Sequence, residues 1–238
     1  MIVLKFIISK EIFNELNNLC VGVVVAKGID NSKEYPNINS ILQNSIFVAE
    51  QNFLDKKVKE DERIIPYREA FQKLGINPNK YQCSVEAMFN RISKGKGLPN
   101  INPLVNLNNA ISLKYTLPMG THDLSTSTED IEMRYSKDND TFKPMGTESI
   151  EKPDSGEVVY AVGNQVRTRR WTWRQSEEGK IDENTNYVFF PIDGFVGLND
   201  NKVKEATEEL KNILIENFKC KVVTGYVDKD NPVFEWNL

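Results

Sequence analysis

The stretch Leu98–Asp123, LPNINPLVNLNNAISLKYTLPMGTHD, contains a complete helix signal followed by a polar turn. Asn102 is a favourable N-cap, and Pro103 is a favourable first helical residue. Apolar residues then recur at roughly helical spacing, namely Leu104, Val105, Leu107, Ile111 and Leu113. Pro118 cannot continue a helix, so the pattern predicts an amide-rich helix that ends just before it. The turn that follows carries His122, the only histidine of the chain.

The composition is that of a soluble globular protein without a broad basic surface. The chain has 238 residues, 39% hydrophobic and 27% charged, and its formal net charge is −4. An acidic protein of this kind is no general binder of polyanions, so any nucleic-acid contact must come from a local basic patch. The N-terminal run MIVLKFIISKEIF lacks a basic region and a small-residue cleavage site, and we expect a first strand there rather than a signal peptide.

The cysteines and the known sequence fingerprints exclude several classes of function. Cys20, Cys83 and Cys220 are far apart and form no CxxC pair, which argues against a disulfide framework and a zinc site. We therefore expect a reducing, cytoplasmic location. No phosphate-binding loop, dinucleotide fingerprint or serine-hydrolase elbow occurs, and no apolar run is long enough to span a membrane. We expect no cofactor and no bound metal.

The order of predicted elements indicates an α+β fold, with a mixed or antiparallel sheet flanked by helices. Residues 1–60 read as a β-α-β-α part whose strands are buried on both faces. We expect this part to pack onto residues 61–238 and to form one compact domain with them. Further predicted helices and strands are, in order, a helix at Ile41–Lys59, a helix at Ile65–Lys73, a helix with Ser84 as its N-cap, Ile131–Tyr135, Glu157–Ala161, Gln165–Arg174, Tyr187–Ile192, a helix capped by Asn199 or Asp200, and Lys221–Val227 as the last strand.

Two polar features lie in or just after the opening stretch. Asn106 and Asn109 are three residues apart and share one face of the predicted helix. They suit the wall of a polar pocket, although exposed or capping asparagines are the simpler interpretation. His122 could act as a general base near neutral pH, whereas the simpler interpretation places it on the surface of a turn that Asp123 caps.

The run Val166–Arg174, VRTRRWTWR, interleaves basic and aromatic residues. As one strand, it would place Arg167, Arg169, Trp171 and Trp173 on a single face. Such a surface can bind single-stranded nucleic acid by stacking and phosphate contacts. The alternative is that the tryptophans are packed in the core and the arginine stems cover them. Glu177 and Glu178 follow, either to bind a substrate ammonium group or as solvated surface.

These residues together resemble the B3/B4 domain of the phenylalanyl-tRNA synthetase beta subunit, above all its free-standing relatives. The resemblance runs from about Arg63 to Phe195. It rests on Tyr67-Arg68, Leu74-Gly75, Lys94-Gly95-Lys96, Ile101 to Val105, Ser112 to Tyr115, Leu117 to Gly120, Gly156 to Ala161, Arg169 to Trp171 and Trp173-Arg174. The aminoacylation and anticodon-binding modules of a synthetase are not present in this sequence.

The resemblance implies an editing-type pocket and a tRNA partner. The family motif falls on Asn109, Pro118 and Asp123, and Gly120 stands where the editing enzymes have histidine. Asn106 stands where many free-standing relatives have aspartate. The resemblance implies substrate binding by Asn106, Pro118, Gly120 and Asp123. In the family, this domain hydrolyses an amino acid wrongly esterified to tRNA. The implied roles are catalysis for Asn109 and for Glu177 or its neighbour Glu178, one of which matches a family glutamate, and contact with the tRNA end for Arg169, Arg170, Trp173 and Arg174. We expect tRNA or aminoacyl-tRNA as partner, and neither DNA nor a membrane. The alternative is a non-catalytic module that binds tRNA or an amino acid.

Overall fold

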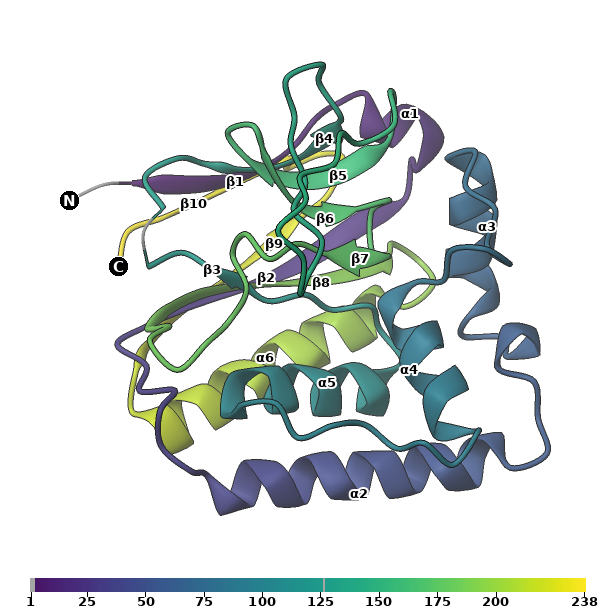
Figure 1. The fold of residues 1–238 in the computed structure, drawn as a ribbon, viewed down its shortest axis with the longest axis vertical. Coiled ribbons are helices and arrows are strands. Elements are labelled where there is room, and N and C mark those ends of the chain that lie inside the picture. Colours follow the sequence, from purple (N-terminus) through teal and green to yellow (C-terminus); the bar gives the residue numbers. More distant parts are fainter. Residues whose placement is uncertain (1–2, 126) are drawn as a thin grey trace.

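The chain folds into two stacked β-sheets with a layer of helices on the outer face of one of them (Figure 1). The computed structural model describes residues 3–125 and 127–238, so the predicted first strand residue Ile2 lies outside the described part. The α+β class predicted from the sequence is confirmed. Within the described residues, no helix is both long and apolar enough to cross a lipid bilayer.

Six strands form the first sheet, in the order β10-β1-β4-β5-β6-β7. Strands β1 and β4 are parallel, and the other neighbours are antiparallel. The sheet is therefore mixed, as the sequence predicts. Its strands are β1 (Leu4–Ile8), β4 (Ile131–Tyr135), β5 (Val158–Val162), β6 (Gln165–Arg169), β7 (Arg174–Gln175) and β10 (Val233–Trp236).

Four antiparallel strands form the second sheet, in the order β3-β8-β2-β9. Strand β2 lies in its centre and is buried along almost its whole length. It has apolar side chains on both faces because the sheet is covered by the first sheet on one side and by helices on the other. The strands are β2 (Leu19–Lys27), β3 (His122–Asp123), β8 (Tyr187–Phe195) and β9 (Lys221–Val227).

The helices gather on one side and one end of the sheets (Figure 1). Helices α5 and α6 lie beneath the second sheet, α2 packs against α5 as the outermost element, and α3 and α4 stand at one end. The bounds are α1 (Ile12–Glu15), α2 (Pro36–Phe53), α3 (Ile65–Lys73), α4 (Ser84–Ile92), α5 (Pro103–Tyr115) and α6 (Asp200–Phe218), with a short 3-10 helix at Val58–Glu60.

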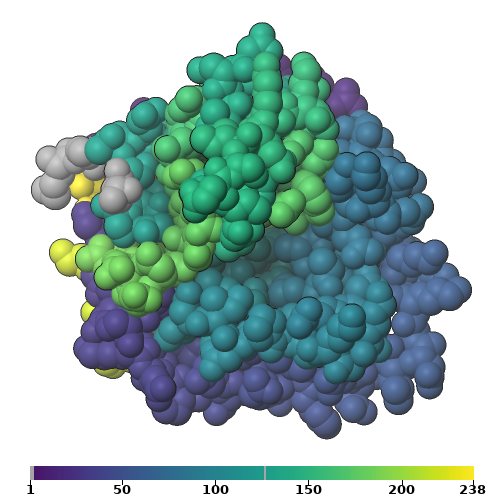
Figure 2. All heavy atoms as spheres, in the orientation of Figure 1, coloured from purple at the N-terminus to yellow at the C-terminus, as the bar shows by residue number. Residues whose placement is uncertain are grey.

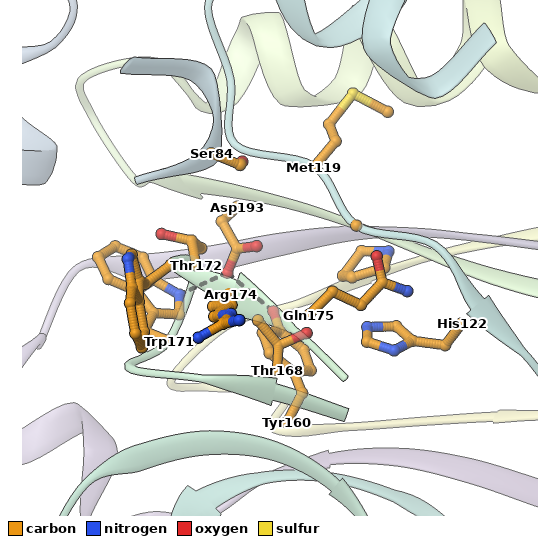
Figure 3. A pocket seen from close by; sticks show the side chains of 13 residues that line it. Ser84, Met119, His122, Tyr160, Thr168, Trp171, Thr172, Arg174, Gln175 and Asp193 are labelled. Atoms are coloured by element: carbon orange, nitrogen blue, oxygen red, sulfur yellow. Dashed lines mark hydrogen bonds between the residues drawn. The ribbon is translucent and has the colours of Figure 1, made fainter. Parts of the chain in front are cut away.

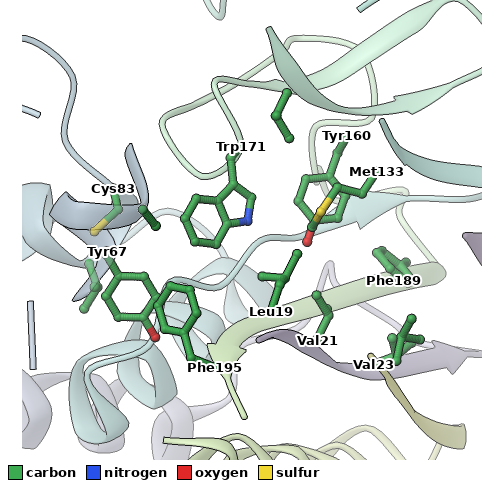
Figure 4. Packing of buried hydrophobic residues seen from close by; sticks show 14 of the residues in the cluster. Leu19, Val21, Val23, Tyr67, Cys83, Met133, Tyr160, Trp171, Phe189 and Phe195 are labelled. Atoms are coloured by element: carbon green, nitrogen blue, oxygen red, sulfur yellow. The ribbon is translucent and has the colours of Figure 1, made fainter. Parts of the chain in front are cut away.

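Alternate residues of β2 belong to two separate cores. Val21, Val23 and Val25 face the first sheet, in the core that Figure 4 shows around Trp171, Tyr160 and Phe189. Cys20, Val24 and Ala26 face the helices instead. Because successive side chains of a strand point to opposite faces, one β-branched run contributes to both layers. Each buried valine stabilises the fold by about 1.5–3 kcal/mol relative to exposure.

Helix α5 has the ends that the sequence predicts. The Asn102 side chain accepts a hydrogen bond from the backbone N–H of Val105 at 3.0 Å, and Pro103 is the first helical residue. Thr116 ends the helix in the left-handed conformation, with φ of 57°. The prediction of α3 as Ile65–Lys73 is also confirmed. The prediction of Ser84 as the N-cap of the next helix is wrong by one residue, because Cys83 is the N-cap, and the Ser84 hydroxyl makes no capping hydrogen bond.

Residues 1–60 contain their elements in the predicted order strand, helix, strand, helix. Strand β2 is buried on both faces as predicted, whereas buried and half-buried residues alternate in β1. The two strands lie in different sheets, and α1 is a single turn. The second predicted helix also begins and ends earlier, at Pro36 and Phe53. Strand β8 continues through Asp193 and Gly194 to Phe195 rather than ending before them, and β10 follows β9 as the last strand.

The predicted single strand through Arg174 is also wrong. Strand β6 ends at Arg169, a turn follows, and β7 begins at Arg174. Arg170 and Trp171 have φ of 46° and 60°, so both lie in the left-handed region. The basic and aromatic side chains therefore do not share one face. Trp171 is fully buried, as the packing alternative predicts.

Candidate functional site

A small pocket of about 70 Å³ lies where the two sheets meet the start of α4. Figure 2 shows that this face of the molecule is hollowed between the green surface of the second half of the chain and the blue-teal surface of the helical region. Figure 3 shows the side chains from close by. The lining residues are Ser84, Met119, Gly120, His122, Tyr160, Thr168, Trp171, Thr172, Trp173, Arg174, Gln175, Pro191 and Asp193.

Backbone pairing with β8 brings the end of the opening stretch into this pocket. The N–H of Asp193 donates to the carbonyl of Pro118 at 3.0 Å, and the N–H of Gly120 donates to the carbonyl of Pro191 at 3.1 Å. His122 then pairs with Phe189 across β3 and β8. The chain from Pro118 to Asp123 thus runs antiparallel along β8 and forms one wall.

Asp193 is a buried carboxyl group at the inner end of the pocket. Its Oδ1 accepts hydrogen bonds from the Tyr160 hydroxyl at 2.8 Å and from the Trp171 indole N–H at 2.7 Å (Figure 3). Oδ2 has no such bond from the described residues. Burial raises the pKa of Asp193 to about 7, although the two donors favour the ionised form and oppose this shift. The carboxyl group therefore exchanges a proton near neutral pH.

His122 is buried beside Asp193's partner Tyr160, and the interpretation that placed it on the surface is wrong. Its ring lies 5.7 Å from the Tyr160 ring, between centroids. Neither ring nitrogen has a hydrogen-bond partner among the described residues. Burial, together with the nearby positive charge of Arg167, lowers the pKa of His122 to about 3. At neutral pH the imidazole is uncharged and offers one donor and one acceptor to the pocket.

Gly120 leaves room for this imidazole. A Cβ atom at residue 120 would lie 3.4 Å from Nε2 of His122 and 3.3 Å from Cγ of Pro191. The histidine two residues later in the chain thus reaches the space beside residue 120. The His122 imidazole therefore stands next to the residue at which the resemblance expects histidine.

Two hydroxyl groups add further unpaired polar atoms. Ser84 Oγ, at the first residue of α4, and Thr172 Oγ1, in the turn after β6, are both buried and have no partner among the described residues. Buried polar groups are nearly always hydrogen-bonded in folded proteins. Four unpaired polar atoms from three residues around one pocket therefore indicate a site that binds a polar ligand.

The turn at Arg170 and Trp171, which brings Trp171 to the pocket, is strained but firmly held. Left-handed backbone costs a non-glycine residue of order 1 kcal/mol, and here two such residues are consecutive. The N–H of Arg170 donates to Glu157 Oε1 at 2.9 Å, and the N–H of Trp171 donates to the Val158 carbonyl at 2.7 Å. These bonds fix the turn that carries Trp171 to Asp193 and Thr172 to the pocket.

The comparisons with known proteins place the chain in a family. A family model described as the B3/4 domain matches residues 66–218. This chain belongs to the B3/4 domain family. The resemblance predicted from the sequence is thereby confirmed at the level of the family. No functionally curated protein matches the chain.

Among solved structures, the fold is similar to an N-terminal fragment of the phenylalanyl-tRNA synthetase beta subunit from Pyrococcus horikoshii. The TM-score is 0.49 and the sequence identity is 10%. The alignment covers 91% of this chain and 49% of the fragment, so the B3/4 protein described here spans about half the length of that structure.

Three of the residues predicted for the site line the pocket that contains Asp193, namely Gly120, Trp173 and Arg174. Pro118 is buried beside it and contributes its carbonyl to Asp193. Asp123 lies next to the pocket on β3, but its carboxylate accepts hydrogen bonds from the N–H of Ser125 and the hydroxyl of Thr185.

The amide pair lies elsewhere. Asn106 is buried near the start of α5, where its side chain donates to Asn39 at 3.1 Å and Asn100 at 2.6 Å. Asn109 is half-buried on α5 and is absent from the pocket lining. The structure thus does not bring the amide pair and the pocket together, and the catalytic role of Asn109 stays a prediction.

The remaining predicted residues are bound to other side chains. Arg169 donates to both oxygens of Glu157, at 2.9 and 2.8 Å, and Arg170 pairs with Asp154 at 2.5 Å. Glu177 pairs with Lys180 at 2.9 Å and lies outside the pocket lining, as does Glu178. Their proposed contacts with tRNA stay predictions.

Sequence reasoning missed Asp193, Ser84, Thr172 and Gln175 as site residues. The sequence does contain a signal for Asp193. This carboxylate directly follows the apolar run Val188 to Ile192, in a strand that is buried on both faces, and a charged residue in such a strand indicates a special role. Ser84 and Thr172 have none, since a serine at a helix start and a threonine in a strand-like run are ordinary. Gln175 Nε2 donates to the Thr121 carbonyl and thereby links β7 to the opposite wall.

Proposed function

We propose that this B3/4 domain protein binds the aminoacyl end of a tRNA and hydrolyses the ester. The observation that supports it best is that Asp193 and His122 line the same pocket. The carboxyl group titrates near neutral pH, and the imidazole stays uncharged there. General acid–base catalysis is most effective when the pKa of the group lies near the working pH.

The reaction needs no nucleophile from the protein. Ionised Asp193 takes a proton from a water molecule through Oδ2 as the water oxygen attacks the ester carbonyl carbon. The bond between that carbon and the ribose oxygen then breaks, and Asp193 returns the proton to the leaving ribose oxygen. The products are the free amino acid and the tRNA with its terminal hydroxyl restored.

His122, Ser84 and Thr172 would position the reactants. The neutral imidazole can accept a hydrogen bond from the water and donate one to the carbonyl oxygen, because its two nitrogens differ in protonation. Ser84 and Thr172 each offer a hydroxyl donor that no other described group uses. Donors already in place for the developing negative charge lower the barrier without reorganisation.

Trp173 and Arg174 supply the contact with the nucleotide end. Arg174 is exposed, and its Cζ lies 5.8 Å from the centre of the Trp173 ring at the edge of the pocket. A half-buried indole can stack on a base, while a free guanidinium can bind the adjacent phosphate. This is the local basic feature that an acidic protein needs to hold RNA.

The alternative, binding without hydrolysis, is favoured by a different observation. The residue at position 120 is glycine rather than the histidine that the resemblance expects, and Asn109 does not line the pocket. A pocket so altered would recognise an aminoacyl end without cleaving it.

The test is a deacylation assay on a panel of correctly and incorrectly charged tRNAs and of free amino-acid esters. We expect loss of ester from at least one mischarged tRNA, reduced about 100-fold or more by Asp193→Asn. Asp138→Asn, at an exposed aspartate, is the matched control and should be without effect. Binding without turnover on any substrate supports the alternative, and turnover of small esters alone contradicts a tRNA substrate.

A further inference from the structure

Arg167 differs from the other buried arginines of the described chain. Four arginine residues are at least nine-tenths buried, namely Arg134, Arg167, Arg169 and Arg170. Three of them form ion pairs, with Asp140, Glu157 and Asp154 as partners at 2.5–2.8 Å. Arg167 has no carboxylate within ion-pair distance among the described residues. Its Nη2 donates to Gln165 at 3.2 Å, and its Nε has no partner.

The guanidinium group lines a second pocket of about 320 Å³. Asp123 of β3 and Arg167 of β6 line this pocket, whereas their neighbours His122 and Thr168 line the first one. Because successive side chains of a strand point to opposite faces, the two pockets lie on opposite sides of β3 and β6. The loop at Gly179 is shaped around the arginine. A Cβ atom at residue 179 would overlap Nη1 of Arg167, and Gly179 has a φ of 75°.

The charges around the pocket select the kind of ligand. A buried guanidinium that has no carboxylate partner is costly, and its planar fork matches a carboxylate. However, Asp123, Glu129 and Glu178 also line the pocket, against only Arg167 and Lys180. With three carboxylates to two cations, a phosphate dianion would be repelled. A ligand that carries a carboxylate and an ammonium group together would satisfy both signs.

The side chains offer a place for each group. The Glu178 carboxylate accepts no hydrogen bond and forms no ion pair in the described chain, whereas both oxygens of Asp123 already accept hydrogen bonds. A ligand carboxylate on Arg167 would leave its ammonium group free to pair with Glu178 or Glu129. The hydroxyl groups of Ser127 and Thr128 complete the polar lining.

We propose that the pocket at Arg167 binds a free α-amino acid as its zwitterion, with the carboxylate on the guanidinium group. This site is separate from the ester pocket and does not depend on hydrolysis.

Titration calorimetry of the full chain with the twenty free amino acids tests the site. At least one should bind, and its methyl ester and its decarboxylated amine should each bind about tenfold more weakly or worse, because each lacks the carboxylate. Arg167→Met should remove the binding while the protein stays folded. Arg91→Met, at an exposed arginine of α4 outside both pockets, should bind as the wild type does.

Three outcomes of the amino-acid titrations would overturn the proposal. They are the absence of heat with every amino acid, equal affinity for an amino acid and its methyl ester, and unchanged binding by the Arg167→Met protein. Inorganic phosphate serves as the competing probe, and its binding in place of amino acids would also contradict the charge argument. Because no tRNA is present, the result is independent of the proposed deacylation.

Discussion

At the scale of single residues, His122 and Asp193 have pKa values that are shifted in opposite directions. The pKa of His122 falls from 6.5 to about 3, so its contribution to stability is present above pH 6.5 and is lost as pH falls toward 3. The pKa of Asp193 rises from 3.8 to about 7, so its contribution is present below pH 3.8 and is lost as pH rises through 7. Between about pH 4 and 6.5 the two slopes oppose each other.

Substituting each residue alone should therefore reveal its contribution to the pH dependence of the free energy of unfolding. Relative to wild type, the free energy of unfolding of His122→Phe should fall by about 1.4 kcal/mol for each unit of rising pH in this range, and that of Asp193→Asn should rise by about the same amount. Urea unfolding at several pH values from about 4 to 6.5 measures both. Profiles of both variants parallel to the wild type would contradict the burial of these two groups.

The buried arginines make a second prediction at this scale. Arg169→Met removes the closest ion-pair partner of the buried Glu157 and leaves it only the more distant guanidinium of Arg170, at 3.8 Å. We therefore expect a loss of about 3 kcal/mol in the free energy of unfolding. Arg167→Met removes a charge that no carboxylate pairs with, so stability should stay the same or increase. Denaturant unfolding of the two variants side by side tests this difference. An equal loss of unfolding free energy in both would contradict it and show that Arg167 has a charged partner in the free protein.

At the scale of elements, sequence patterns predicted helices better than the site. The N-cap, the apolar spacing and the proline that follows are local, so α3 and α5 could be read directly from the sequence. The run from Gln165 to Arg174 alternates like one strand, but long-range bonds from Glu157 and Val158 bend it into a left-handed turn at Arg170 and Trp171. Such bonds have no signature in the local sequence, and the pocket depends on them.

The left-handed C-cap of helix α6 can be tested by substitution. Lys219 caps it in the left-handed conformation with φ of 54° and is exposed. Lys219→Gly should raise the free energy of unfolding by up to about 1 kcal/mol, because glycine adopts this conformation without strain. Glu205→Gly, at an exposed position inside the same helix, is the control and should lower it by about 1 kcal/mol. Thermal or urea unfolding reports both signs, and a loss in both proteins would refute the cap.

At the scale of the whole molecule, β2 ties the N-terminal residues to the rest. It pairs with β8 on one side and with β9 on the other, and its side chains enter both cores. The sequence suggested a part of residues 1–60 packed onto a unit of residues 61–238. The central place of β2 explains why such a part would be needed for folding.

A truncated chain of residues 61–238 should therefore not fold on its own. It lacks the strand that joins β8 to β9, and it exposes the apolar faces of both cores. We expect the loss of near-ultraviolet circular dichroism and of a cooperative thermal transition, with the full chain as the reference. A cooperative transition in the truncated chain would instead make residues 1–60 a dispensable addition.

The central claim is that Asp193 transfers the proton in hydrolysis of an aminoacyl-tRNA. The most direct measurement is the single-turnover rate of deacylation between about pH 5.5 and 8.5, for wild type and Asp193→Asn. The wild-type rate should rise with pH and level off above about pH 7, as the carboxyl group of pKa about 7 ionises. Asp193→Asn should be slower by about 100-fold or more and lack that inflection. The same rate and the same pH profile in both proteins would contradict the claim.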